Sequence, residues 1–334
     1  MRINKSMTMT VAAAAVLMAS GCSSDSQQVE RGDEIVLLDV AVLEAPSLTS
    51  FYAPIIDGLG LDLENGIDIN FVPKSAIVLR TEMANGSAQL SAGATVLTDA
   101  ALLNEKGADV RYLFNTYDWW GTVLTPSSSD IQSIKDLEGQ KIVGALATTN
   151  YAMFKITAGL SGVDLNSLQE TNTSPAGLVA TAKSGREQAV QVWEPAHTAA
   201  TQGNDEFRSL DLVGALREAT GLDVIPYVGI AAQNSWIESN EALINPLYAT
   251  FKAAATYIAE NPDDAAQLIA EATGVNVEAM SALLSSPDRF GMNVYPAKDA
   301  SSELEILLQL ATDSGILTEM PELSSTIYQG QIGR

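Results

Sequence analysis

The sequence contains few of the residues on which metal and disulfide chemistry depend. It has one cysteine and one histidine in 334 residues, which excludes an intramolecular disulfide, a cysteine-built zinc or iron–sulfur site, and a multi-histidine site within a single chain. Positive charge is also scarce, because 18 lysines and arginines stand against 41 aspartates and glutamates, for a net charge of −23. Such acidity argues against nucleic-acid binding and against a basic membrane patch. We therefore expect no metal and no nucleic-acid partner.

No apolar run reaches the roughly 18 residues that a membrane-spanning helix needs. The short apolar run Val11–Met18 follows two positive residues, and small residues stand directly before Cys22. This order resembles a bacterial lipoprotein signal. We expect residues 1–21 to be removed, Cys22 to carry lipid, and residues 22–33 to form a polar tether; an ordinary secretory peptide is the alternative. The mature protein is then exported, anchored to a membrane by lipid, and faces the periplasm or the cell exterior.

Segments of strand type and helix type alternate along the rest of the chain. Residues 67–72 alternate with a period of two, which predicts a strand, and residues 76–85 are predicted to form a helix that Gly86 ends. Residues after 239 are predicted to be helical. The alternation predicts an α/β protein with mostly parallel sheets and helices on both faces. With 46% hydrophobic residues, the chain can bury one or two cores.

Polar and aromatic residues gather where the predicted strands end. In open α/β sheets, ligands bind beyond the carboxyl ends of the strands, close to helix N-termini. Three of the four tryptophans (Trp119, Trp120 and Trp193) fall at such ends. The predicted ligand-binding residues are Ser47, Leu48, Thr49, Gly93, Ala94, Thr95, Asp118, Trp119, Thr148, Thr149, Asn150, Tyr151, Trp193, Glu194 and Tyr227.

Several of these residues also have a purely structural interpretation. The tryptophans can pack in a core, and the hydroxyl and amide groups at 148–150 can serve as helix caps. Glu194 can hold a salt bridge or cap a helix instead of accepting hydrogen bonds from a ligand. His197, with no partner motif around it, is expected to be structural or at the surface.

The predicted strand ends contain no lysine or arginine, since Arg80, Arg111, Lys155 and Lys183 are expected to lie away from them. With Asp118, Glu194 and aromatics at these ends, the sequence favours an amine- or ring-bearing organic solute over a sulfonate, and a sulfonate over nitrate. Motifs of nucleophilic hydrolases, zinc proteases and phosphate-binding loops are missing. We therefore expect a binding protein without a cofactor, not an enzyme.

Four stretches, in their order and spacing, resemble the solute-binding proteins of ABC importers, in the branch that binds nitrate, alkanesulfonates, taurine and thiamine-precursor pyrimidines. The sequence departs from that family at Gln188, where an aspartate is usual, and residues 43–50 match no single ligand subfamily. The four stretches are 83–93, 101–111, 134–144 and Val192-Trp193-Glu194-Pro195.

The resemblance implies an α/β, two-lobe, type II periplasmic binding protein fold. Lobe one is expected at 34–121 plus 226–334, lobe two at 122–225, and two crossover hinge segments at 119–123 and 224–228. It implies a monomer that captures a small organic solute (pyrimidine-like, amine-bearing or a sulfonate) by hinge closure and delivers it to an ABC permease and its ATPase. A lipid-anchored solute sensor without transport and a same-fold enzyme of cofactor biosynthesis are the alternatives.

Overall fold

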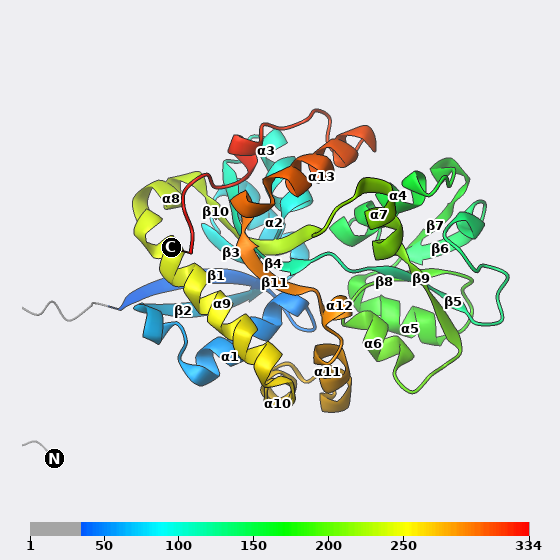
Figure 1. Ribbon diagram of the computed structural model, residues 1–334, viewed down its shortest axis with the longest axis horizontal. Helices are drawn as coiled ribbons and strands as arrows, with labels where there is room; N and C mark the ends of the chain where they lie inside the picture. The colour runs from blue at the N-terminus through cyan, green and yellow to red at the C-terminus, as the bar shows by residue number, and fades with distance from the viewer. Residues whose placement is uncertain (1–34, 334) are drawn as a thin grey trace, which may run out of the picture. The chain divides into compact units, whose positions relative to one another are not determined.

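A computed structural model describes residues 35–333, and these residues are built around two β-sheets (Figure 1). The predicted signal segment, Cys22 and the tether lie outside the described residues. The first sheet has the strand order β11-β4-β10-β3-β1-β2. We call this sheet and its helices lobe one, residues 35–118 and 226–333. Its strands are β1 (Val36–Leu43), β2 (Ile67–Lys74), β3 (Leu90–Thr95), β4 (Val110–Asp118), β10 (Pro226–Gln233) and β11 (Met292–Pro296).

The second sheet has the order β7-β6-β8-β5-β9. We call this sheet and its helices lobe two, residues 122–220. In both sheets the neighbours β1–β2, β1–β3, β6–β7 and β6–β8 are parallel, whereas β10 and β5 run antiparallel to both of their neighbours. The strands are β5 (Thr122–Pro126), β6 (Lys141–Gly144), β7 (Gln169–Asn172), β8 (Val190–Val192) and β9 (Phe207–Asp211).

Helices pack on both sheets. Lobe one has α1 (Tyr52–Leu59), α2 (Ala76–Asn85), a π-helical segment (Val96–Ala101), α3 (Leu102–Glu105), α8 (Asn234–Asn240), α9 (Ile244–Glu260), α10 (Pro262–Thr273), α11 (Val277–Leu284), α12 (Pro287–Phe290), α13 (Ser301–Asp313) and α14 (Leu323–Thr326). Lobe two has α4 (Thr149–Leu160), α5 (Leu178–Lys183), α6 (Ala196–Thr201) and α7 (Leu212–Thr220). Single 3-10 turns lie at Leu48–Phe51, Leu63–Asn65, Lys135–Leu137, Leu165–Ser167, Pro175–Gly177, Glu241–Leu243 and Ala297–Ala300.

Local capping residues fix the ends of the helices that matter most for the site. The Ser75 hydroxyl accepts a hydrogen bond from the Val78 amide at the start of α2, and Gly86 ends the helix with a φ of +78°. The predicted helix over 76–85 is therefore confirmed. At α4, the Thr148 hydroxyl accepts from the Tyr151 amide. Capping satisfies amides that a helix start leaves without an intrahelical partner.

Three features of the sheets differ from the sequence-based expectations. The region after residue 239 is not entirely helical, because β11 pairs with β4 at the edge of the first sheet. Strand β7 is exposed and polar, so it carries no apolar pattern that would predict it. Five of the nine strand pairings are antiparallel, so both sheets are mixed and not mostly parallel as the alternation predicts.

The two segments that cross between the lobes lie side by side. The Trp119 amide donates to the Ile225 carbonyl over 2.7 Å, and the Asp118 amide donates to the Gly291 carbonyl over 2.7 Å. Gly291 has a φ of +67°, and a Cβ there would lie 2.7 Å from the Asp118 carbonyl oxygen. Only glycine meets both conditions without strain. Gly291 therefore fixes β11 against the first crossover.

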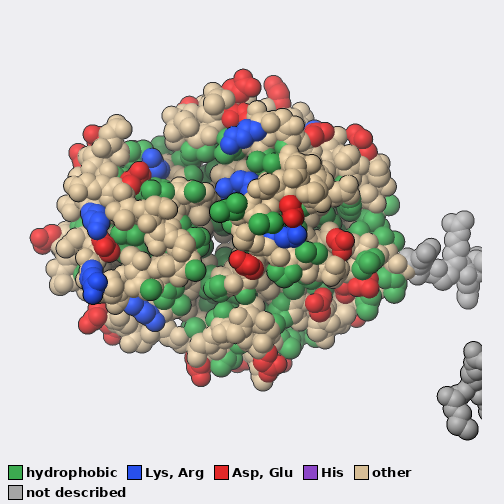
Figure 2. Space-filling model, turned by 180° about the vertical axis from the view of Figure 1, so that it is seen from behind, with side chains coloured by type: hydrophobic (Ala, Val, Ile, Leu, Met, Phe, Trp, Pro, Cys, Tyr) green, Lys and Arg blue, Asp and Glu red, His purple; other side chains and the backbone are tan. Residues whose placement is uncertain are grey.

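A single cluster of buried apolar residues extends through both lobes. It includes Val96 and Leu97 of lobe one, Trp119 of the crossover, and Val123 and Phe154 of lobe two. The exposed face seen in Figure 2 carries many acidic and fewer basic side chains, as the net charge of −23 requires. Within residues 35–333, no helix combines the length and the apolar character needed to cross a membrane.

Candidate functional site

Hydroxyl groups from the two lobes meet at the start of α4. Thr95 ends β3, Thr98 belongs to the π-helical segment, and Thr149 is the first residue of α4. Their hydroxyl oxygens form a triangle with sides of 2.6 Å (Thr98–Thr149), 2.8 Å (Thr95–Thr98) and 2.9 Å (Thr95–Thr149). All three side chains are buried. We call these residues the threonine contact, and it joins two of the predicted site residues, Thr95 and Thr149.

A partly buried ion pair supports the threonine contact from lobe one. Asp99 accepts from the Thr95 amide over 2.9 Å and from the Thr95 hydroxyl over 2.7 Å. The Arg80 Nε lies 2.8 Å from Asp99, and its Nη2 donates to the Thr98 hydroxyl over 3.2 Å. The expectation that Arg80 lies away from the site is therefore wrong. Position 80 is in the middle of α2, but the long side chain reaches the end of β3.

Asn150 connects α4 to the first crossover and to lobe one. Its Oδ1 accepts from the Trp119 indole N–H over 3.0 Å, and its Nδ2 donates to the Tyr227 hydroxyl over 2.6 Å. Burial, followed by the Asp99 charge, raises the pKa of Tyr227. The hydroxyl therefore stays protonated at neutral pH. Trp119, Asn150 and Tyr227, all predicted site residues, are thus brought together beside the threonine contact.

Tyr151 and Thr148 have structural roles in lobe two. The Tyr151 ring packs against Gly144, where a Cβ would lie 2.5 Å from the ring, and its hydroxyl donates to Glu170 over 3.0 Å. Its side chain thus points into lobe two and away from the threonine contact. The Thr148 hydroxyl caps α4 and donates to the Ala145 carbonyl over 2.7 Å.

Glu194 is buried and fully engaged with protein groups. Its Oε2 accepts from the Thr198 amide over 3.0 Å, and its Oε1 accepts from the Thr198 hydroxyl over 3.0 Å. Arg289 of α12 places Nη1 3.4 Å from the same Oε1. The predicted role of Glu194 as a hydrogen-bond acceptor for a ligand is therefore not favoured, because both oxygens already have donors. The structural interpretation, a cap with a salt bridge, describes the observed contacts.

His197 lies between Glu194 and Arg289. Its Nδ1 is 3.2 Å from Glu194 Oε1 and 3.0 Å from Arg289 Nη1, and its Nε2 is 2.9 Å from the Ser209 hydroxyl. Nδ1 thus faces the Glu194 acceptor and the Arg289 donor at once, and the tautomer of the ring decides which of the two it bonds. The Trp120 ring packs edge-on against His197 at 5.0 Å. We call Glu194, His197 and Arg289 the Arg289 clasp.

The remaining predicted residues bond or pack within their own lobe. Asp118 accepts from Tyr295 over 2.6 Å and from Asn293 over 2.9 Å, and burial raises the pKa of its carboxyl despite these bonds. Leu48 accepts from the Tyr117 hydroxyl through its carbonyl. The others are Ser47 and Thr49, whose hydroxyls bond each other, Gly93 and Ala94 in buried β3, and Trp193, half-buried against the core of lobe two.

Sequence reasoning did not single out Thr98, Asp99, Arg289 or Gln191 and misplaced Arg80. Gln191 lies in β8 on the side of Gly144, with Cβ 3.6 Å from the position of a Cβ on that glycine. Its Oε1 is buried and has no hydrogen-bond partner within residues 35–333. An unsatisfied buried acceptor is rare enough to require an explanation. The sequence signal that could have singled out Gln191 is its position as a polar residue between two valines of a buried strand.

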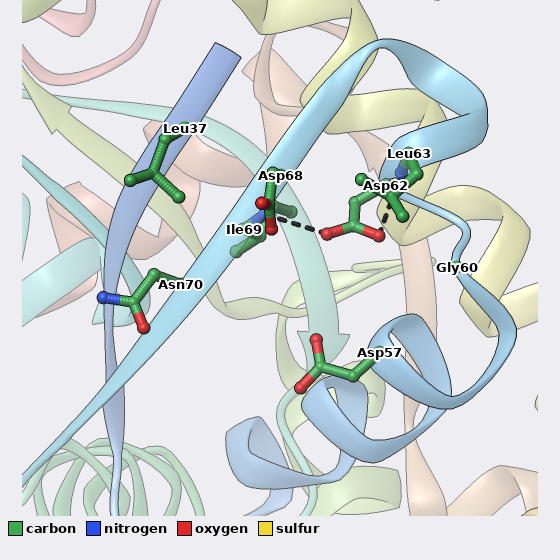
Figure 3. Close-up of a pocket in the computed structure, with 8 residues that line it drawn as sticks. All are labelled: Leu37, Asp57, Gly60, Asp62, Leu63, Asp68, Ile69 and Asn70. Carbon is green, nitrogen blue, oxygen red and sulfur yellow. Dashed lines mark hydrogen bonds between the residues drawn. The ribbon is translucent and has the colours of Figure 1, made fainter. Parts of the chain in front are cut away.

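A separate surface depression of about 480 Å³ lies on lobe one and is lined by three aspartates, Asp57, Asp62 and Asp68 (Figure 3). Both Asp62 oxygens accept backbone amides, from Leu63 over 2.9 Å and from Ile69 over 2.8 Å. Partial desolvation and the two neighbouring charges raise the pKa of Asp57. This depression belongs to one lobe only, and the described residues include no cluster suited to holding a metal ion.

The geometry suits binding between the lobes. The three hydroxyls of the threonine contact and the Arg80 guanidinium lie within hydrogen-bond distance of one another at the start of α4. Donors at a helix N-terminus favour an anionic or acceptor group. These groups come from different lobes, so movement of one lobe changes their spacing. A binding site that closes around its ligand has this arrangement.

Comparison with known proteins agrees with this architecture. The chain is 24% identical over 163 residues to a protein of Escherichia coli (strain K12) named as an aliphatic sulfonates-binding protein, and the match covers 48% of each chain. The chain thus spans about half the length of this curated relative.

Solved structures match over nearly the whole chain. The periplasmic aliphatic sulphonate binding protein SsuA from Escherichia coli has a TM-score of 0.73 at 18% identity, covering 89% of this chain and 94% of that one. The alkanesulfonate-binding protein SsuA from Xanthomonas axonopodis pv. citri, bound to MOPS, has a TM-score of 0.71 at 16% identity over 88% of this chain and 99% of that one. The predicted type II periplasmic binding protein fold is therefore confirmed.

The nitrate-binding protein NrtA from Synechocystis PCC 6803 has a TM-score of 0.64 at 13% identity, covering 88% of this chain and 84% of that one. The sequence profile of the NMT1/THI5-like family matches residues 63–265, which is more than half of the chain. This span contains α2, the threonine contact, Asn150 and Glu194. The chain belongs to the NMT1/THI5-like family.

Proposed function

We propose that the protein is the solute-binding component of an ABC importer and that it binds small organic sulfonates between lobe one and lobe two. The observation that carries the proposal is the threonine contact, in which donors of both lobes meet at the start of α4 beside Arg80. The names of the similar proteins, several of which bind sulfonates, support the same class of solute.

The placement of Arg80 changes the ranking of solutes that the sequence favours. An amine ranked first because no cation was expected near the site. Arg80 is close to the threonine contact, and Asp99 balances its charge. Such a pair, with hydroxyls and helix amides, can donate several hydrogen bonds to three sulfonate oxygens without a free cation. Sulfonates therefore rank above amines, and nitrate, with no organic part for Trp119 and Tyr227 to contact, ranks last.

Capture would proceed by closure of the lobes. In an open form, Thr149 separates from Thr95 and Thr98, and their hydroxyls become available to solute oxygens. Closure then places the solute between the lobes, and the closed protein docks on a permease that an ATPase drives. A lipid on Cys22, outside the described residues, would keep the protein close to that permease and raise its effective concentration.

Titration calorimetry on the full chain tests the proposal. Ethanesulfonate and taurine are expected to bind, and the Thr149→Val variant is expected to bind them about fivefold more weakly because one donor is lost. Thr157→Val is the matched control, since the Thr157 hydroxyl bonds only the Met153 carbonyl within the same helix. Absence of sulfonate binding, or affinity unchanged in Thr149→Val, would contradict the proposal.

A further inference from the structure

The lobes also touch at a second place, where no solute contact is proposed. Arg289 belongs to the short helix α12 of lobe one, directly before Gly291 and β11, whereas Glu194 and His197 belong to lobe two. Nearby, α11 of lobe one packs against α6 of lobe two. The Arg289 clasp therefore bridges the lobes through side chains that are 92 residues or more apart in sequence.

The burial of the clasp makes it energetically different from a surface ion pair. The Glu194 side chain has an exposed fraction of 0%, that of His197 is 8% and that of Arg289 is 30%. A buried carboxylate needs donors, and Thr198 supplies two of them from lobe two. Arg289 is the cation that comes from the other lobe, in an ion pair with Glu194 and within hydrogen-bond distance of His197. In an open form, Arg289 would leave, and Glu194 would keep only donors of lobe two.

The clasp is also tied to the crossovers. Trp120 packs against the His197 ring, and the Gly291 carbonyl accepts from the Asp118 amide. Phe290, next to Arg289, packs edge-on against Tyr117 at 5.5 Å. Movement at the crossovers thus changes the position of both halves of the clasp. The threonine contact and the clasp therefore form two interlobe contacts held by different elements.

We propose that Arg289 is a positioning residue that stabilises the closed form and thereby raises solute affinity without touching the solute. This inference rests on the proposed function. The solute binds the closed form, so its apparent affinity rises with the fraction of molecules that are closed. Any interaction that stabilises the closed form therefore raises the affinity. The ion pair with a buried carboxylate is an interaction of this kind, because removal of one partner leaves a buried charge without compensation.

Two measurements on the full chain test the inference. Small-angle scattering without solute is expected to give a larger radius of gyration for Arg289→Met than for the wild type. Calorimetry with ethanesulfonate is expected to give about tenfold weaker binding. Arg289→Lys, which keeps a donor and the charge, is expected to restore part of both values. Arg111→Met is the matched control, because Arg111 pairs with Asp109 within lobe one.

The outcomes separate this inference from the proposed function. If Arg289→Met has the radius and the affinity of the wild type, or if Arg111→Met weakens binding equally, the clasp does not set closure. If Arg289→Lys restores neither the radius of gyration nor the affinity, the positive charge at position 289 does not stabilise the closed form. If the wild type binds no sulfonate, the proposed function fails, and scattering alone still decides whether the clasp holds the lobes together.

Discussion

The Asn150 side chain donates to the Tyr227 hydroxyl over 2.6 Å, so the start of α4 in lobe two is bonded directly to β10 of lobe one. The same amide group accepts from the Trp119 indole of the crossover. Asn150 therefore uses both ends of its side chain to hold the lobes at the hinge, although the sequence suggested only a cap or a ligand contact for it.

Tyr227→Phe tests this bond. The variant leaves the Asn150 Nδ2 buried without its partner, and the free energy of unfolding is expected to fall by about 1–2 kcal/mol. Urea unfolding measures the change, and ethanesulfonate affinity should fall with it. Tyr328→Phe is the control, because the Tyr328 hydroxyl bonds to exposed Glu241. Equal stability losses in the two variants would show that the bond between Asn150 and Tyr227 stabilises the fold no more than an exposed side-chain bond does.

Gln191→Met is expected to stabilise the protein. The Oε1 of Gln191 is buried without a partner within the described residues, and an apolar side chain of similar length removes that desolvation cost. The melting temperature should rise, with a gain of about 1 kcal/mol. Met153→Leu, a volume-conserving change on α4, controls for repacking of the same core. A lower melting temperature for Gln191→Met would mean that the Gln191 Oε1 accepts a hydrogen bond in solution.

The pH dependence of stability should differ between the wild type and Asp118→Asn. Burial raises the pKa of Asp118 from its ordinary value of 3.8, against the hydrogen bonds from Tyr295, Asn293 and Asn115. The folded protein then binds this proton more tightly than the unfolded chain does. The wild type therefore loses stability relative to Asp118→Asn as the pH rises from about 4 through the raised pKa. Urea midpoints at several pH values measure the difference, and parallel curves would refute it.

Cys22→Ala tests the predicted anchor. If lipid on Cys22 holds the protein to a membrane, the variant should leave the membrane fraction or remain unprocessed. Fractionation after a salt wash is the measurement. A net charge of −23 makes electrostatic attachment to an acidic membrane a poor alternative. Retention of the variant in washed membranes would therefore contradict the lipoprotein interpretation.

Local signals predicted much of the fold, and tertiary pairing explains what they missed. Helix α2 begins and ends at the predicted residues, because serine at its start and glycine at its end act locally. Strand β11 is held by pairing with β4, more than 170 residues earlier, and no local pattern carries that information.

The candidate site was predicted only in part for a similar reason. The sequence places Thr95, Thr149, Asn150 and Tyr227 at strand ends or helix starts, where binding groups are expected. It cannot give the direction of a long side chain, so Arg80 was assigned to the wrong place. Tyr151 was included because it follows the helix start, but a glycine opposite its ring leaves room for it inside lobe two.

The bond between the Trp119 amide and the Ile225 carbonyl limits how the two halves of the molecule can move. If one linking segment turned while the other stayed, this bond would break, and so would the pairing of Asp118 with Pro226 beside it. The segments should therefore rotate together about one shared axis. With a single axis, the angle between the lobes is the one variable that a second protein would need to recognise in order to distinguish an open from a closed form.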